Sequence, residues 1–267
     1  MSHAVSDPAA LERRAVSSAM QAVAAHTDAA ELTAEALTVR FQGLAAVSDV
    51  SLTVGRHEVF GLIGPNGAGK TTLVNCLTGF QAPTEGRVLI GRESTAGWSP
   101  MRFREQGVAR TFQAGRLFKE MSVLENVEIT AVGLGLRRRR AVEHGRIALE
   151  WVGLADKASL PAGALAYTDQ RRLGIARAMV LPPAFILLDE PAAGMSDAEC
   201  EDLMVLVAAI PKAFGSGVLL IEHNMRVVMG ISHRVHVLDG GRTIAEGTPA
   251  EIQRDAVVLA AYLGAEA

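Results

Sequence analysis

The 267-residue chain has few of the residues that build metal, redox or nucleic-acid sites. Its two cysteines, Cys76 and Cys200, lie far apart with no second pair, so no metal-binding or redox motif is present and both thiols are expected to be buried or inert. Positive charge is not in excess, because 26 lysines and arginines against 29 aspartates and glutamates give a formal net charge of −3. This balance gives no support to a polyanion-binding surface, and no nucleic-acid partner is predicted.

Long apolar runs are also missing. No stretch approaches the ~20 residues needed to cross a bilayer, and the longest candidates are the size of single strands. Near the amino terminus, residues 15–25 are small and mildly apolar but follow the acidic Asp7 and Glu12. A flexible alanine-rich tail over residues 1–33 is therefore favoured over a secretory signal. Any membrane role is expected to act through a partner.

What the chain does contain is an alternation of strand and helix patterns. Period-two alternation at 37–41 and 47–54, with a turn near Gln42 and Gly43, predicts two antiparallel strands. Later apolar runs alternate with helix-like segments, which predicts an α/β fold with a mostly parallel sheet covered on both faces. Helix-like spacing between about 120 and 182 predicts a helical lobe. The other expected elements are strands at 59–63, 86–90, 184–188, 218–221 and 235–238, and helices near 71–77, 199–209 and 225–230.

Residues 64–72, GPNGAGKTT, satisfy the phosphate-loop pattern GxxxxGK[ST] between a buried strand and a helix start. Small residues let backbone N–H groups converge on phosphate oxygens, and the helix that follows adds its positive dipole end. Lys70 supplies a charge for the β- and γ-phosphates, and the Thr71 hydroxyl is placed to coordinate Mg²⁺. A chance glycine-rich turn is disfavoured by this context. The predicted ligands are ATP and Mg²⁺, and the predicted contacts are Gly64, Pro65, Asn66, Gly67, Ala68, Gly69, Lys70, Thr71 and Thr72.

Two adjacent carboxylates follow the apolar run 185–188, at Asp189 and Glu190. A strand that ends at a solvated acidic turn is the alternative interpretation, but the neighbouring phosphate loop favours a functional one. We predict that Asp189 holds Mg²⁺ through water and that Glu190 polarises the water attacking the γ-phosphate.

These motifs and their order resemble those of the ATP-binding cassette (ABC) ATPases over roughly residues 34–264. The resemblance implies a P-loop NTPase with a RecA-like sheet, an antiparallel β subdomain and an inserted helical lobe. The run Arg110-Thr111-Phe112-Gln113 resembles the family's Q-loop, which implies that Gln113 contacts Mg²⁺ and senses a partner. His223 stands in a run similar to the switch region, which implies contact with the γ-phosphate. Phe41 falls where the family stacks an aromatic ring on adenine, although it could equally be a core residue.

The family's signature loop, commonly LSGGQ, completes the ATP site of the opposite subunit and is matched here by the run Leu165, Ala166, Tyr167, Thr168 and Asp169. Thr168 is the sharpest departure, because its side chain narrows the approach of backbone N–H groups to phosphate. Alternatively, its hydroxyl could cap the following helix. Ser196 is a second departure, at a position where the family usually has aspartate.

Longer stretches resemble the ATPase subunits of branched-chain amino-acid importers, at 75–80, 110–118, 189–194, 246–252 and 261–264. The resemblance implies a peripheral ATPase on the cytoplasmic face of the cell membrane that powers uptake of branched-chain amino acids or a similar small polar metabolite. It also implies transmembrane permease subunits and a second ATPase subunit, identical or related, as partners, and indirectly a substrate-binding protein. Gln113 and the following Leu117 and Phe118 are expected to receive a helix of the permease.

Three alternatives stay open at this point. The basic run Arg137–Arg140 is either a solvated patch or a contact for anionic lipid headgroups. A non-transport ABC ATPase would usually carry two cassettes, long coiled coils or a zinc module, none of which is visible in the sequence. A low-turnover, nucleotide-gated clamp is kept open by Thr168.

Overall fold

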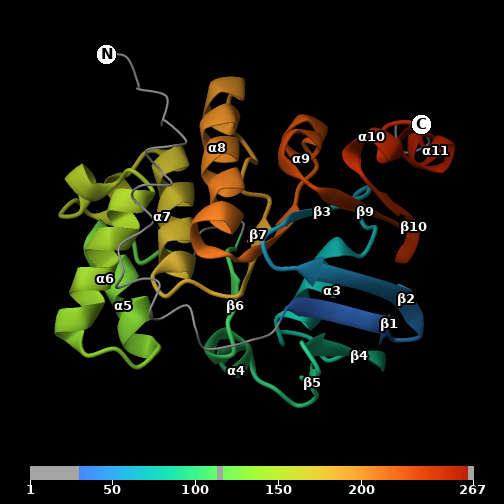
Figure 1. Cartoon of the computed structure of the whole chain (residues 1–267), viewed down its shortest axis with the longest axis horizontal. Helices are drawn as coiled ribbons and strands as arrows, with labels where there is room; N and C mark the ends of the chain where they lie inside the picture. Colours follow the sequence, from blue (N-terminus) through green and yellow to red (C-terminus); the bar gives the residue numbers. More distant parts are fainter. Residues whose placement is uncertain (1–29, 113–116, 264–267) are drawn as a thin grey trace.

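The computed structural model describes residues 30–112 and 117–263. It contains two β-sheets and a group of helices that extends to one side of them (Figure 1). The arrangement is the predicted α/β fold with a mostly parallel sheet, an antiparallel subdomain and a helical lobe.

The antiparallel sheet has the strand order β2-β1-β4-β5. A turn at Gln42 and Gly43 joins the first two strands, as predicted. The first strand begins at Glu31, inside the range assigned to the tail, because Leu32 and Ala34 alternate into the core with 0% and 1% exposure. The predicted boundary at residue 33 is therefore wrong by a few residues. The strands are β1 (Glu31–Phe41), β2 (Leu44–Gly55), β4 (Glu85–Ile90) and β5 (Glu93–Ser94).

The second sheet has the order β10-β9-β3-β8-β7-β6, parallel throughout except for the antiparallel edge strand β10. Every residue of the central strands β3 and β8 is buried, as expected of strands covered on both faces. The edge strands β6 and β10 were not predicted. The strands are β3 (Val59–Ile63), β6 (Val108–Arg110), β7 (Phe185–Asp189), β8 (Gly217–Ile221), β9 (Arg234–Asp239) and β10 (Arg242–Gly247).

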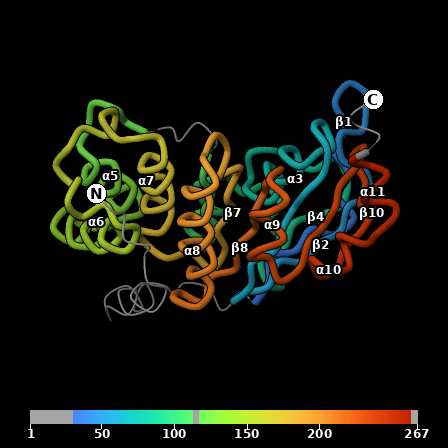
Figure 2. Tube along the Cα trace, turned by 90° about the horizontal axis from the view of Figure 1, so that it is seen from above, coloured from blue at the N-terminus to red at the C-terminus, as the bar shows by residue number. Residues whose placement is uncertain are grey.

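Helices cover both faces of this parallel sheet. The predicted lobe is confirmed as α5, α6 and α7, which pack on one another beside α8 (Figures 1 and 2). No helix of the described ranges is both long and apolar enough to span a membrane. The helices are α3 (Lys70–Leu77), α4 (Pro100–Glu105), α5 (Val123–Gly133), α6 (Arg138–Trp151), α7 (Tyr167–Met179), α8 (Asp197–Phe214), α9 (Met225–Ile231), α10 (Pro249–Ile252) and α11 (Ala256–Leu263), with 3₁₀ turns η2 (Ala155–Lys157) and η3 (Ala162–Ala164).

Alternate side chains of the parallel strands enter different hydrophobic clusters. In β7, Ile186 and Leu188 pack with the lobe and α8, whereas Phe185 and Leu187 pack with α3 and the antiparallel sheet. The same strand thus fastens the lobe and the phosphate-loop helix to one sheet. Both cysteines lie in these clusters and are buried, as predicted, and burial raises the pKa of Cys76 to about 11.

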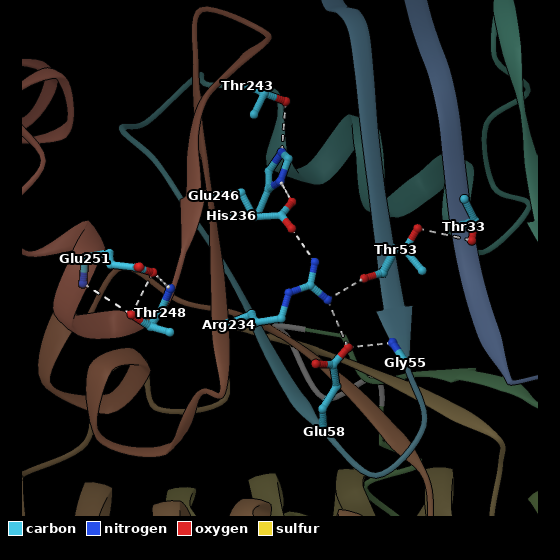
Figure 3. Close-up of polar contacts among 10 residues, drawn as sticks. All are labelled: Thr33, Thr53, Gly55, Glu58, Arg234, His236, Thr243, Glu246, Thr248 and Glu251. Atoms are coloured by element: carbon cyan, nitrogen blue, oxygen red, sulfur yellow. Dashed lines mark hydrogen bonds and ion pairs between the residues drawn. The ribbon is translucent and has the colours of Figure 1, made fainter.

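A polar network joins the two sheets (Figure 3). Arg234 on β9 pairs with Glu246 on β10 and with Glu58, and it donates to the carbonyl oxygen of Thr53 on β2 at 3.3 Å. His236 is fully buried, and its Nδ1 lies 2.7 Å from Oε2 of Glu246. The guanidinium group of Arg234 stacks over the Phe60 ring. The network fixes β2 against the strands that flank the phosphate loop.

Candidate nucleotide site

The phosphate loop runs from the end of β3 to the start of α3. Gly64 has φ +151°, and a Cβ on it would lie 2.0 Å from the carbonyl oxygen of Leu238. Gly69 has φ +98°, and a Cβ on it would lie 2.5 Å from the carbonyl oxygen of Ala46. Neither position accommodates a side chain. Gly69 is the N-cap of α3 and provides no side-chain cap, so the N–H groups of the first turn are left for another acceptor. The loop therefore fits a phosphate group at the helix start.

Lys70 lies almost buried beneath this loop and donates from Nζ to the carbonyl oxygens of Gly64 and Pro65 at 2.6 and 3.0 Å. Burial lowers the pKa of the ammonium group, and the nearby Glu190 and Asp189 oppose that shift. The three charged residues predicted from two separate motifs therefore act on one another in the fold.

Asp189 forms an ion pair that the sequence did not indicate. Its Oδ2 lies 2.6 Å from Nη2 of Arg110, whose Nη1 lies 2.6 Å from Oδ1 of Asn75 on α3. The side chains of Arg110 and Asp189 are 7% and 14% exposed. Arg110 thus connects the acidic end of β7 to the phosphate-loop helix. The sequence signal for this ion pair is an arginine at the end of one strand and an aspartate at the end of the neighbouring strand.

A metal ion at this site would need oxygens from the nucleotide. The described ranges contain no group of three or more histidines, cysteines or acids that could hold one. Thr71 in the first turn of α3 and Asp189 supply a hydroxyl and a carboxylate, which are the oxygen donors that Mg²⁺ takes alongside phosphate. Gln113, the third predicted metal contact, lies outside the described residues.

Glu190 and His223 follow the neighbouring strands β7 and β8, so their side chains meet at the same sheet edge. His223 Nδ1 lies 3.9 Å from Glu190 Oε1, and Glu190 adopts a positive φ of 46° while its N–H donates to the carbonyl of Ile221. Positive φ is costly for a residue with a side chain and is typical of functional positions.

Sequence reasoning missed Glu222, which is fully buried behind this pair. Its carboxylate accepts from the backbone N–H groups of Ala192 at 2.7 Å and His223 at 3.2 Å. Burial raises its pKa, and these hydrogen bonds oppose the shift. An acid at the end of a completely buried strand was the available signal.

Phe41 ends β1 and is 49% exposed, so the alternative of a core residue is excluded. Its role in adenine stacking stays a prediction.

The segment from Leu165 to Asp169 forms the start of α7 in the lobe. Leu165 is buried, and Ala166 is the N-cap without a side-chain hydrogen bond, so the alternative of Thr168 as the cap is wrong. Thr168 instead donates its hydroxyl hydrogen to Glu199 on α8, and Asp169 pairs with Lys157 at 2.5 Å. In both views α8 lies between α7 and α3 (Figures 1 and 2). The fold does not bring this segment to the chain's own phosphate loop.

Comparisons with known proteins agree with this geometry. Residues 47–193 match the family model described as ABC transporter, and residues 242–267 match the model described as branched-chain amino acid ATP-binding cassette transporter. The chain is 44% identical over 248 residues to the LivG high-affinity branched-chain amino acid transport ATP-binding protein of Salmonella typhimurium, covering 87% of this chain and 97% of that one.

It is also 44% identical over 243 residues to the corresponding BraF protein of Pseudomonas aeruginosa, covering 85% and 95%. Among solved structures, the ADP conformation of MJ1267, an ATP-binding cassette of an ABC transporter, superposes with a TM-score of 0.79 at 30% identity, covering 87% of this chain and 98% of that one.

Proposed function

The chain belongs to the ATP-binding proteins of ABC transporters, and from that membership we propose that it works as one of two ATPase subunits driving uptake of branched-chain amino acids or a similar small polar metabolite. The cargo is supported by the names of the relatives and by the match of the carboxyl-terminal residues 242–267. In this proposal the cargo is recognised by the permease and a substrate-binding protein.

The observation that carries the proposal is the meeting of Lys70, Asp189, Glu190 and His223 at the carboxyl ends of β3, β7 and β8. Lys70 holds the β- and γ-phosphates against the N–H groups of α3. Glu190 takes the proton of the attacking water, and His223 steadies the γ-phosphate. Bound Mg²⁺, held by Thr71 and Asp189, supplies neutralisation of the charge that develops on the phosphates.

A second chain completes the site. Ala166 and Tyr167 of the segment Leu165–Asp169 are exposed, and α8 separates this segment from α3, so it serves the phosphate loop of a neighbour rather than its own. Two chains then enclose two ATP molecules, and the closure pulls on the permease.

Contact with the permease is assigned to the lobe side of the site. A cavity of about 460 Å³ lies between β6 and α7, and Phe118, 46% exposed, is among its lining residues. An exposed aromatic ring beside a hollow suits a helix from the membrane subunit. Arg137–Arg140 are all exposed, with Arg138 paired to Glu128, and they form a basic surface of the lobe. As an ATPase subunit that contacts a permease, the protein is proposed to lie on the cytoplasmic face of the membrane.

The experiment is substitution of Glu190 by Gln. We expect ATP binding to persist and a dimer to accumulate in Mg-ATP, while phosphate release falls by at least about 100-fold because the proton acceptor is gone. Size-exclusion chromatography and a phosphate-release assay measure both. Glu201→Gln, which alters an exposed carboxylate on α8, is the control. Unchanged phosphate release in Glu190→Gln would remove Glu190 from catalysis.

Membrane pull-down tests the partners. Tagged protein should recover two membrane proteins, and cells depleted of the chain should lose uptake of radiolabelled leucine. Recovery of ribosomes or DNA instead would favour a non-transport ATPase. The clamp alternative requires almost no phosphate release from the unaltered dimer.

A further inference from the structure

The hydroxyl of Thr168 is committed to its own chain. Thr168 is the second residue of α7, and its hydroxyl donates to Oε1 of Glu199, the third residue of α8. The side chain that stands where the family has glycine is therefore directed toward a neighbouring helix. It does not cap α7, and its hydroxyl is not left without a hydrogen-bond partner beside the phosphate-facing backbone.

The second carboxylate oxygen of Glu199 holds the other departure from the family pattern. Glu199 Oε2 accepts from the backbone N–H of Ser196 at 2.9 Å and from its hydroxyl at 2.7 Å, in a capping box at the start of α8. These hydrogen bonds, that of Thr168 first, lower the pKa of Glu199 to about 2. One carboxylate thus binds both unusual residues, and it stays charged at neutral pH.

The loop ahead of Ser196 is also anchored at its other end. The N–H of Ala192 donates to buried Glu222, the residue before His223, and the N–H of Ala193 donates to the carbonyl of Glu190 at 3.3 Å. The Tyr167 ring on α7 also lies near this loop, since a Cβ added to Gly194 would be 3.6 Å from the ring. Hydrogen bonds therefore link Thr168 to Glu199 and Glu199 to Ser196, the residue that ends the loop following Glu190.

We propose that Glu199 is a positioning residue that ties the start of α7 to the loop 191–196. Through this link, the segment at the start of α7, which faces a neighbour's ATP, sets the positions of Glu190 and His223 in its own chain. The inference rests on the proposed pairing of two chains. It explains why Thr168 and Ser196 occur together, since each is a donor to the same carboxylate.

The test compares Thr168→Val, which removes the donor and keeps the shape, with Thr168→Ser, which keeps the hydroxyl. Both are placed in the Glu190→Gln background for dimerisation and in the unaltered chain for turnover. The control is Thr53→Val, which deletes another half-buried hydroxyl, bonded to Thr33 on the antiparallel sheet (Figure 3). Measurements are the dimer dissociation constant in Mg-ATP, kcat, ATP affinity of the monomer in EDTA, and hydrogen exchange of amides 192–196.

We expect Thr168→Val to raise the dimer dissociation constant and lower kcat, each about tenfold, because a hydrogen bond to a charged group is lost. Monomer ATP affinity stays unchanged, and amides 192–196 exchange faster. Thr168→Ser and Thr53→Val behave like the parent. Unaltered exchange of the loop in Thr168→Val overturns the inference, even if dimerisation weakens.

Failure of the proposed pairing gives a different result. If no Glu190→Gln variant dimerises in Mg-ATP, including the one with Thr168 intact, the pairing is wrong. The exchange comparison still decides the link through Glu199: faster exchange in Thr168→Val with rescue in Thr168→Ser supports it, and equal exchange overturns it.

Discussion

Arg110 neutralises Asp189 in an ion pair that is almost completely removed from solvent. The arginine also bonds Asn75 and stacks beside Phe112 at 5.1 Å, so its position is fixed from three sides. Arg110→Met keeps much of the side-chain volume but leaves the carboxylate of Asp189 without its cation. We expect a loss of about 3 kcal/mol in the free energy of unfolding, measured by urea denaturation without nucleotide.

The matched control for this pair is Arg87→Met. Arg87 pairs with Glu35 at the same distance of 2.6 Å, but the side chains are 61% and 42% exposed. A solvent-exposed pair contributes less than about 1 kcal/mol. Equal losses in the two variants would show that burial does not decide the contribution of the Arg110 pair.

The positions of residues that are set by their immediate neighbours in the sequence could be predicted. Lys70, Asp189 and Glu190 lie close enough to act on one another's charge, as expected from a glycine-rich turn and an acid after a buried run, which imply their local geometry. Arg110 and Glu222 were not, because their partners lie 79 and 30 residues away and only sheet pairing brings them together. The roles given to individual site residues in contact with ATP or Mg²⁺ remain predictions.

Elements were predictable where the hydrophobic pattern is strong. The buried strands β3, β7 and β8 read as apolar runs because both of their faces are covered. The edge strand β10 was missed, since only Ile244 of its apolar residues is large, and β6 was missed because it has three residues. The sequence pattern of neither strand is strong enough to favour a strand over a loop.

Glu246 on β10 holds Arg234 and His236 on the neighbouring strand β9, and Arg234 in turn reaches Thr53 on β2 of the other sheet (Figure 3). The hydrogen bond from His236 is the largest cause that lowers the pKa of Glu246 below its ordinary value of 4.5. A lowered carboxyl pKa means that the charged form stabilises the fold at neutral pH, and that this stabilisation is lost as pH falls below about 4.5.

We therefore expect Glu246→Gln to lower the free energy of unfolding by about 1 kcal/mol at pH 7, a value reduced by solvent because Glu246 is 30% exposed. The difference from the parent should shrink as pH is lowered below 4.5, because the parent then loses the same interaction. Urea unfolding of both proteins over a pH series measures this difference in the free energy of unfolding. Glu85→Gln, at an exposed pair with Arg40, should show no such dependence. A constant difference at all pH values would contradict the electrostatic origin.

At the scale of the whole molecule, the described residues hold the two halves of the proposed composite site apart from each other. The phosphate loop lies with α3 beside the antiparallel sheet, and the start of α7 lies in the lobe on the far side of α8 (Figure 2). In the proposed pair of chains, a twofold axis would bring the phosphate loop of each chain to the start of α7 of the other. The proposed requirement for two chains would follow from this layout, and it can be tested with two inactive variants.

One variant carries Lys70→Ala, which disables the phosphate loop and leaves residues 165–169 intact. The other carries Thr168→Arg, which places a long side chain in that segment and leaves the phosphate loop intact. Each homodimer contains two defective sites. A mixed dimer contains one in which an intact loop faces an intact segment, so mixing the inactive proteins should partly restore phosphate release. Differently tagged chains confirm that mixed dimers form, and their formation without any recovery of activity would show that each chain completes its own site.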